Sequence, residues 1–268
     1  MAAEPAHELV VVGGGNMGAA LLGGLIGSAW APAERLAVVE VLDATRHDLA
    51  ARFAGVTVSA DIVAAAGVVI AVKPGDAPAA VSAAVAAGAR RVLSIAAGVS
   101  IATLQAAAGD GVAVVRAMPN TPALVGQGAA AIAGGSSADN DDLAWAESIL
   151  RAVGIVVRVP ESQLDAVTGL AGSGPGYLFL VAEALVEAGV LAGLPRPTAD
   201  ALVTQLLVGS AALLAERGDP ARLRANVTSP GGTTAAGLQV LEQRGVRAAF
   251  LDAVEAATAR SRALGQPH

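Results

Sequence analysis

Apolar and polar positions follow different patterns in the two halves of the chain. Up to about residue 160, short runs of Val, Ile and Leu alternate with longer Ala-rich stretches. The runs are almost continuously apolar, which is typical of strands covered on both faces. The pattern predicts strands at 8–12, 36–39, 56–58, 68–72, 92–95 and 113–116. Because the intervals leave room for crossover helices, we expect an open parallel sheet with helices on both sides.

Two further apolar runs, 129–133 and 155–159, predict edge strands, with a helix over 139–152 between them. After Pro160 no strand pattern remains. Helices are expected there at 164–170, 177–192, 198–217, 233–243 and 246–264. The predicted fold is therefore an α/β Rossmann-like N-terminal domain at 1–159, a parallel sheet with edge additions. An all-α domain at 160–268 follows it.

The predicted helices of the second half are apolar around much of their circumference. One of them carries Leu202, Val203, Leu206, Leu207 and Leu214. Such a helix needs burial on more than one side, and a small helical domain does not provide it alone. We therefore expect a homodimer formed through the helical domain.

Composition narrows the function classes. Hydrophobic residues make up 54% of the 268 residues, aromatic residues 2%, and the formal net charge is −6. An acidic, aromatic-poor chain is not expected to bind nucleic acid. The chain has no cysteine, and its three histidines lack metal-ligand spacing, so no metal site is expected. The longest uncharged segment is rich in glycine and follows an acidic flank. We therefore expect a soluble, cytoplasmic protein without a membrane segment.

A glycine-rich turn follows the first predicted strand. It reads Gly13-Gly14-Gly15-Asn16-Met17-Gly18, a G-x-G-x-x-G at the start of a predicted helix. In this pattern the first glycine makes the tight turn, the second admits a pyrophosphate, and the third allows close packing of helix on strand. The helix N-terminus adds N–H donors and partial positive charge. The context predicts binding of a nicotinamide dinucleotide.

Glu40 follows the second predicted strand, 22 residues after Gly18. A carboxylate there accepts hydrogen bonds from the adenosine ribose and repels a 2′-phosphate, which favours NADH over NADPH. An ordinary solvated glutamate is the alternative, and Arg46 lies near enough in sequence to contact a phosphate.

Two later strands end in loops suited to the same cofactor. Ala71-Val72-Lys73-Pro74 follows the fourth strand and contains the only lysine. We expect Lys73 to support the cofactor rather than to transfer a proton. Ala96-Ala97-Gly98 follows the fifth strand, and its small residues would let a nicotinamide ring lie against the backbone.

Segment 227–234 reads VTSPGGTT and precedes a predicted helix. Successive N–H groups in such a turn form an anion cradle, which would suit a carboxylate. An ordinary helix cap by Ser or Thr is an equal alternative. The Gly-Ser-Gly-Pro sequence at 172–175 predicts a hinge, a turn or a floor under a ligand. Ser173 lacks a neighbouring histidine and is not expected to be a nucleophile.

Five blocks taken together resemble the pyrroline-5-carboxylate reductase family: AVKP at 71–74, SIAAGVS at 94–100, RAMPNTP at 116–122, DAVTGLAGSGP at 165–175 and VTSPGGTTAAGL at 227–238. The resemblance covers nearly the whole chain. It implies a Rossmann domain followed by a helical dimerisation domain, an active site at the dimer interface, and in some members assembly to a decamer. It also implies reduction of L-1-pyrroline-5-carboxylate to L-proline by NADH or NADPH.

The resemblance also implies roles for individual residues. Thr234 would bond near the ring nitrogen and act in catalysis. The cofactor set would be Gly13, Gly14, Gly15, Asn16, Met17, Glu40, Ala71, Val72, Lys73, Pro74, Ala96, Ala97, Gly98 and Asn226. The substrate set would be Glu161, Ser229, Gly231, Gly232, Thr233 and Thr234.

The chain departs from the family pattern at two positions. Members often have Ser, Asn or Arg where Glu40 stands, and many have an Asn where Ile62 stands. Three alternatives remain: a β-hydroxyacid dehydrogenase, another cyclic imine reductase, and a nucleotide-binding scaffold without turnover. The first is weakened because that class uses a lysine in its second half, and this chain has none after Lys73.

Overall fold

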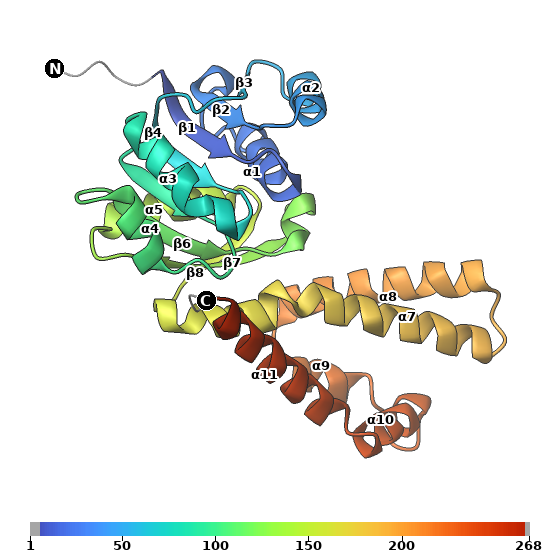
Figure 1. The fold of residues 1–268 in the computed structure, drawn as a ribbon. Helices are drawn as coiled ribbons and strands as arrows, with labels where there is room; N and C mark the ends of the chain where they lie inside the picture. Colours follow the sequence, from blue (N-terminus) through green and yellow to red (C-terminus); the bar gives the residue numbers. More distant parts are fainter. Residues whose placement is uncertain (1–5, 266–268) are drawn as a thin grey trace. The chain divides into compact units, whose positions relative to one another are not determined.

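The computed structural model describes residues 6–265 and divides the chain into two compact units. The first contains the chain up to Ser173 together with the C-terminal end from Ala256 onward. The second is Gly174–Glu255. Figure 1 shows the sheet of the first unit and the helices of the second. The predicted boundary at 159/160 marks where strands give way to helices in sequence, and it stays a prediction.

The first unit is built on one eight-stranded sheet in the order β3-β2-β1-β4-β5-β6-β7-β8. All neighbouring strands are parallel except β6 and β7, which are antiparallel. This confirms the Rossmann-like parallel sheet with additions at one edge. The strands are β1 His7–Val12, β2 Leu36–Val39, β3 Thr57–Ser59, β4 Ala65–Ile70, β5 Arg91–Ser94, β6 Ala113–Met118, β7 Gly128–Gly134 and β8 Gly154–Arg158.

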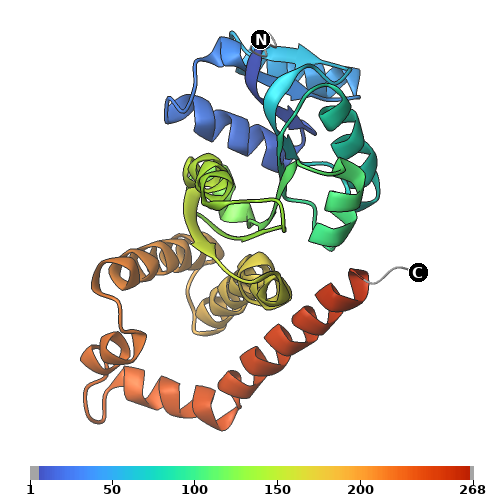
Figure 2. The same cartoon turned by 90° about the vertical axis from the view of Figure 1, so that its left-hand side faces the viewer.

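Helices cover both faces of this sheet, as Figure 2 shows. Leu9 and Val11 of β1 pack in one apolar cluster with residues of α1 and α5, whereas Val10 and Val12 pack in another with α3 and α4. Successive side chains of a strand point to opposite faces, so covering both faces requires an apolar residue at every position. The main helices are α1 Asn16–Gly27, α2 Asp43–Arg52, α3 Ala77–Ala86, α4 Ile101–Ala108 and α5 Asn140–Arg151.

Helix α5 begins with a capping box at Asp139. The Asp139 carboxylate accepts hydrogen bonds from the backbone N–H groups of Asp141 and Asp142, and the Asp142 side chain accepts one from Asp139 N. These hydrogen bonds, that of Asp142 N first, hold the pKa of Asp139 below its ordinary value. Asp142 also accepts a hydrogen bond from Arg91 Nε on β5, at 2.7 Å.

The chain enters the second unit through a helix that does not break at the Gly-Ser-Gly-Pro sequence. Helix α6 Leu164–Val167 continues as a π-helical turn, η5 Thr168–Gly172, and then as α7 Gly174–Leu191. Ser173 N donates to Thr168 O, the five-residue spacing of a π turn. The helix predicted at 164–170 is thus longer, because the glycines are absorbed by a wider turn.

The second unit is entirely helical. After α7 come α8 Arg196–Arg217, α9 Pro220–Asn226, α10 Thr233–Gln243 and α11 Val246–Leu264, whose end belongs to the first unit. Helix α9 was not predicted, because seven residues are too few for a clear apolar period. The buried cluster within the unit is small: Val186, Ala199 and Val203.

Two helical segments, Glu161–Leu191 and Arg196–Arg217, are long and apolar enough to cross a membrane by length and composition. Exposed apolar side chains are frequent on them, among them Leu178, Phe179 and Leu180 on α7 and Leu202, Leu206 and Val208 on α8. A second protein chain would cover such surfaces as well as lipid would. That no membrane is involved stays a prediction.

Candidate active site

The glycine loop lies at the carboxyl end of β1, beside β4, where the strand order reverses. Gly13 has φ +105°, and a Cβ there would stand 2.5 Å from Ala71 O. A Cβ on Gly18 would stand 2.0 Å from Gly13 O. Both positions therefore require glycine, one for the turn and one for the approach of α1 to the loop, as the motif predicts.

The start of α1 is open toward a ligand. A Cβ on Gly15 would meet no described atom within 4 Å. Among the described residues, no side chain caps the helix and no acidic residue lies in its first turn. The unpaired N–H groups and the helix dipole therefore fit the pyrophosphate of a dinucleotide.

Glu40 stands at the end of β2 and reaches this loop. Its Oε2 accepts a hydrogen bond from Gly14 N at 3.0 Å, and its Oε1 accepts one from Leu42 N at 2.9 Å. The predicted position of the acid directly after the second strand is thus confirmed. Its role toward a cofactor stays a prediction.

The Arg46 side chain already has two partners. Its Nη1 donates to the backbone carbonyl of Glu40 at 2.8 Å, and its guanidinium pairs with Asp43. A guanidinium with both of these partners is already neutralised, so it is poorly placed to bind a 2′-phosphate as well.

A hollow of about 310 Å³ adjoins the glycine loop. It lies between the loop and α2, and Leu124 also borders it. Its lining residues are Gly14, Gly15, Asn16, Ala19, Ala20, Thr45, Asp48, Leu49, Arg52 and Leu124.

The other predicted cofactor loops leave the same edge of the sheet. Residues 71–74 follow β4, and the chain at Lys73 and Pro74 is exposed. Residues 96–98 follow β5, with Ala96 buried, Ala97 exposed and Gly98 at φ +76°. Parallel strands bring their carboxyl ends to one edge, so the structure collects these loops beside Gly13–Met17. Asn226 lies in the second unit.

Glu161 takes part in a network that the sequence did not reveal. Its Oε1 accepts hydrogen bonds from Ile101 N at 2.7 Å and from Arg116 Nη1 at 3.0 Å. The Arg116 side chain is only 11% exposed. A lone arginine inside the apolar strand AVVRAM was the available signal, since an arginine buried in a sheet needs a partner. The predicted substrate contact of Glu161 is untested.

The substrate segment predicted at 229–234 lies in the second unit and spans the start of α10 at Thr233. Gly231 has φ +70°, Gly232 is the N-cap residue, and no described side chain caps this helix. The alternative of a Ser or Thr cap is therefore wrong. Thr233 and Thr234 are exposed. An uncapped glycine turn leaves N–H groups for an anion, as a carboxylate site requires.

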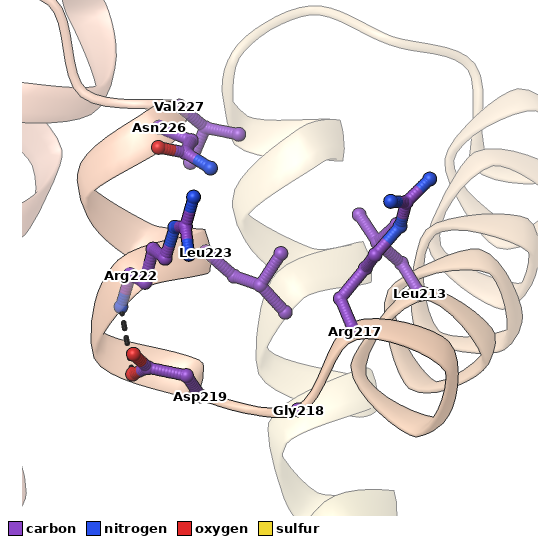
Figure 3. A pocket seen from close by; sticks show the side chains of 8 residues that line it. All are labelled: Leu213, Arg217, Gly218, Asp219, Arg222, Leu223, Asn226 and Val227. Carbon is purple, nitrogen blue, oxygen red and sulfur yellow. Dashed lines mark hydrogen bonds between the residues drawn. The ribbon is translucent and has the colours of Figure 1, made fainter.

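A hollow of about 430 Å³ lies elsewhere in this unit, around the α8–α9 connection (Figure 3). Of the predicted site residues, only Asn226 borders it. Arg217, on its other side, pairs with Glu216 at 3.1 Å. The size of this hollow does not make it the reaction site, because it does not include residues 229–234.

The sheet order, the glycine loop and the open α1 terminus define a nicotinamide-dependent oxidoreductase with a Rossmann-like domain. Two family models match the chain. "NADP oxidoreductase coenzyme F420-dependent" matches residues 8–98, and "Pyrroline-5-carboxylate reductase dimerisation" matches residues 161–264.

Individual relatives agree with these models. The chain is 43% identical to a pyrroline-5-carboxylate reductase of Mycobacterium tuberculosis over 96% of both chains. It is 54% identical to that of a Synechocystis species, over 58% of each chain. A Coxiella burnetii pyrroline-5-carboxylate reductase structure has a TM-score of 0.90 at 35% identity, covering 98% of this chain and all of that one.

A Plasmodium falciparum pyrroline carboxylate reductase with NADP bound has a TM-score of 0.82 at 28% identity, again covering 98% of this chain and all of that one. The chain belongs to the pyrroline-5-carboxylate reductase family. Its helical region is that family's dimerisation region.

Proposed function

We propose that the chain reduces L-1-pyrroline-5-carboxylate to L-proline with NADH as the preferred donor. The observation that carries the proposal is a pair of uncapped, glycine-lined helix starts. One, at α1, fits a pyrophosphate, and the other, at α10, fits a carboxylate. The chain belongs to the pyrroline-5-carboxylate reductase family, and this membership identifies the substrate whose carboxylate the α10 start would bind.

The bound cofactor supplies a hydride to the carbon of the C=N bond. The chain contributes binding and orientation. The backbone at Ser229–Thr233 holds the substrate carboxylate, and the Thr234 hydroxyl forms a hydrogen bond near the ring nitrogen. An imine nitrogen is protonated from water without a tuned side chain, so the absence of cysteine and of a suitably placed histidine is no obstacle. Most of the rate enhancement then comes from positioning.

The preference for NADH rests on the adenosine end of the site. Glu40 places a carboxylate beside the glycine loop, and Arg46, on α2, is engaged with Asp43 and the Glu40 carbonyl. A 2′-phosphate would meet the Glu40 carboxylate beside the glycine loop, whereas a 2′-hydroxyl would find an acceptor there.

The test is oxidation of NADH and of NADPH by the purified protein with L-1-pyrroline-5-carboxylate. We expect turnover with both donors and a higher kcat/KM with NADH. Turnover that favours NADPH would leave the reaction standing and remove the role of Glu40. Cofactor binding without turnover would favour the scaffold reading, and turnover confined to a six-membered cyclic imine would change the substrate.

We further propose that the working form is a cytoplasmic homodimer joined through the helical unit, as the dimerisation family model supports. Assembly of dimers to a decamer is a separate expectation, and sedimentation of the purified protein measures it directly.

A further inference from the structure

Three residues from separate elements meet at one carboxylate oxygen in the first unit. Arg116 comes from β6, Glu161 from the start of the long helix that leads into α7, and Ile101 is the first residue of α4. Both Arg116 Nη1 and Ile101 N donate to Glu161 Oε1, at 3.0 and 2.7 Å. The arrangement joins segments that are 45 and 60 residues apart in sequence.

This network holds both ends of one loop. Residues 95–100 connect β5 to α4 and include Ala96, Ala97 and Gly98. At the loop's entry, Ser94 pairs with Arg116 across the β5–β6 ladder. At its exit, Ile101 N is fixed by Glu161. The loop is therefore anchored at entry by the strand that carries Arg116 and at exit by the carboxylate that Arg116 holds.

The burial of the ion pair makes the position of the Glu161 carboxylate depend on Arg116. Arg116 is 11% and Glu161 36% exposed at their side chains. If the Glu161 carboxylate loses the positive charge of Arg116, it turns toward water, because an unpaired charge is costly away from solvent. Ile101 N would then lose its hydrogen-bond acceptor. The 95–100 loop would no longer be fixed at its C-terminal end.

A hollow of about 360 Å³ borders this network. It is lined by Gly98, Ser100, Arg116, Glu161, Ser162, Asp165, Arg262 and Gly265. Gly98 thus faces the same space as the ion pair. The C-terminal end of α11 also lies there, since a Cβ on Gly98 would stand 3.6 Å from Leu264.

We propose that Arg116 is a positioning residue: by holding Glu161 it fixes the 95–100 loop in the conformation that receives the nicotinamide ring. The inference rests on the proposed function, because it takes this loop as the nicotinamide side of the cofactor site. It assigns Arg116 no contact with the substrate or the cofactor.

The test compares two ligands that share the pyrophosphate. NADH has the nicotinamide, and ADP-ribose lacks it. Arg116→Met should raise the Kd of NADH about tenfold in calorimetry and leave that of ADP-ribose within twofold, because only the nicotinamide side loses its support. In turnover it should lower kcat roughly 10- to 100-fold with a smaller change in the KM for the imine.

Two variants separate positioning from general stability. Arg116→Lys should restore most of the NADH affinity, since a single N–H contact joins the pair and a lysine can supply it. Arg91→Met is the matched control. It removes a similar ion pair, to Asp142, at the amino end of β5. It should lower the melting temperature without changing the ratio of NADH to ADP-ribose affinity.

A double-mutant cycle checks the route through Glu161. If Arg116 acts through that carboxylate, Arg116→Met combined with Glu161→Ala, which removes the acceptor for Ile101 N, should cost no more NADH affinity than the larger single effect. The proposal is overturned if NADH and ADP-ribose weaken equally, if Arg91→Met reproduces the effect, or if the two losses add. Should Arg116→Met fail to fold, Glu161→Ala alone, which removes the acceptor for Ile101 N, must weaken NADH binding selectively.

The binding measurements keep this proposal apart from the proposed function. Wild-type protein without turnover on L-1-pyrroline-5-carboxylate would contradict the reaction. The comparison of NADH with ADP-ribose would still decide the role of Arg116.

Discussion

Two glutamates each hold a backbone segment at the carboxyl edge of the sheet. Glu40 accepts a hydrogen bond from Gly14 N of the glycine loop, and Glu161 accepts one from Ile101 N after the loop at 95–100. Each carboxylate therefore fixes a backbone segment at the carboxyl edge of the sheet. Hydrogen bonds to a charged acceptor are stronger than neutral ones, which suits them to holding loops that must not move when a ligand arrives.

The first prediction concerns cofactor choice. Glu40→Gln keeps an acceptor for Gly14 N and removes the charge that would repel a 2′-phosphate. We expect the ratio of kcat/KM for NADPH to that for NADH to rise roughly 10- to 100-fold, mainly through NADPH. Steady-state kinetics with both donors measure it. An unchanged ratio would show that the Glu40 charge does not discriminate.

The second prediction concerns Thr234. Thr234→Ala removes the hydroxyl expected near the ring nitrogen, so kcat should fall roughly 10- to 100-fold with an unchanged Kd for NADH. Thr204→Ala is the control, because that hydroxyl bonds only Asp200 O of its own helix among the contacts described. Unchanged turnover in Thr234→Ala would remove this residue from the mechanism.

At the scale of elements, helix starts divide into capped and open ones. Helices α4 and α5 are capped by Ser100 and Asp139, whereas α1 and α10 begin at glycines without a described side-chain cap. At a capped helix start, N–H groups of the first turn donate hydrogen bonds to a side chain of the protein itself. Helices α2, α3, α6 and α8 also lack a side-chain cap. Helices α1 and α10 differ from these four in having a glycine at the N-cap, and they are the two that the proposed function assigns to ligands.

The third prediction follows from the Asp139 cap. Its pKa is lowered from 3.8 by hydrogen bonds from α5, so the carboxylate stabilises the fold above about pH 4 and that stabilisation is lost as the pH falls through the lowered value. Asp139→Ala should lower the melting temperature by about 1–4 °C at pH 7. As the pH falls below about 4 that difference should shrink.

Asp139→Asn is the matched variant, since its side chain still accepts from Asp142 N without a charge to titrate. Thermal unfolding across pH 3–8 compares the three proteins. A difference between Asp139→Ala and wild type that stays constant down to pH 3 would contradict the assignment.

At the scale of the whole molecule, the second unit buries few apolar side chains by itself. Its own cluster is Val186, Ala199 and Val203, whereas large apolar side chains on α7 and α8 are exposed. Apolar surface of this extent is removed from water when two copies associate, which is the behaviour that the dimerisation family model describes.

The fourth prediction tests that association. Leu206 on α8 is 53% exposed, and Leu206→Glu should shift the protein from dimer toward monomer at micromolar concentration in analytical ultracentrifugation. Ile155→Glu on β8 is the control, an apolar side chain of similar exposure, 66%, in the first unit. It should leave the dimer intact. A dimer unaffected by Leu206→Glu would place the interface elsewhere.

The sequence by itself determined the strands, the glycine loop and the position of Glu40. Strands such as His7–Val12 are apolar at every position because both faces are covered, and this leaves a clear trace in the order of residues. Gly18 is required because a Cβ there would clash with the carbonyl of Gly13, five residues earlier, and Gly13 because of its positive φ in the turn. Such local demands act over a short stretch of chain, so they can be read without the fold.

The tertiary structure decided what depends on distant partners. The meeting of Arg116, Glu161 and Ile101 joins elements that no local pattern connects. The π turn at Thr168–Gly172 carried the helix past glycines that predicted a break, and the open start of α10 removed the helix-cap alternative. These features depend on long-range packing and on which hydrogen-bond partner is within reach, and neither is encoded in the spacing of residues along the chain.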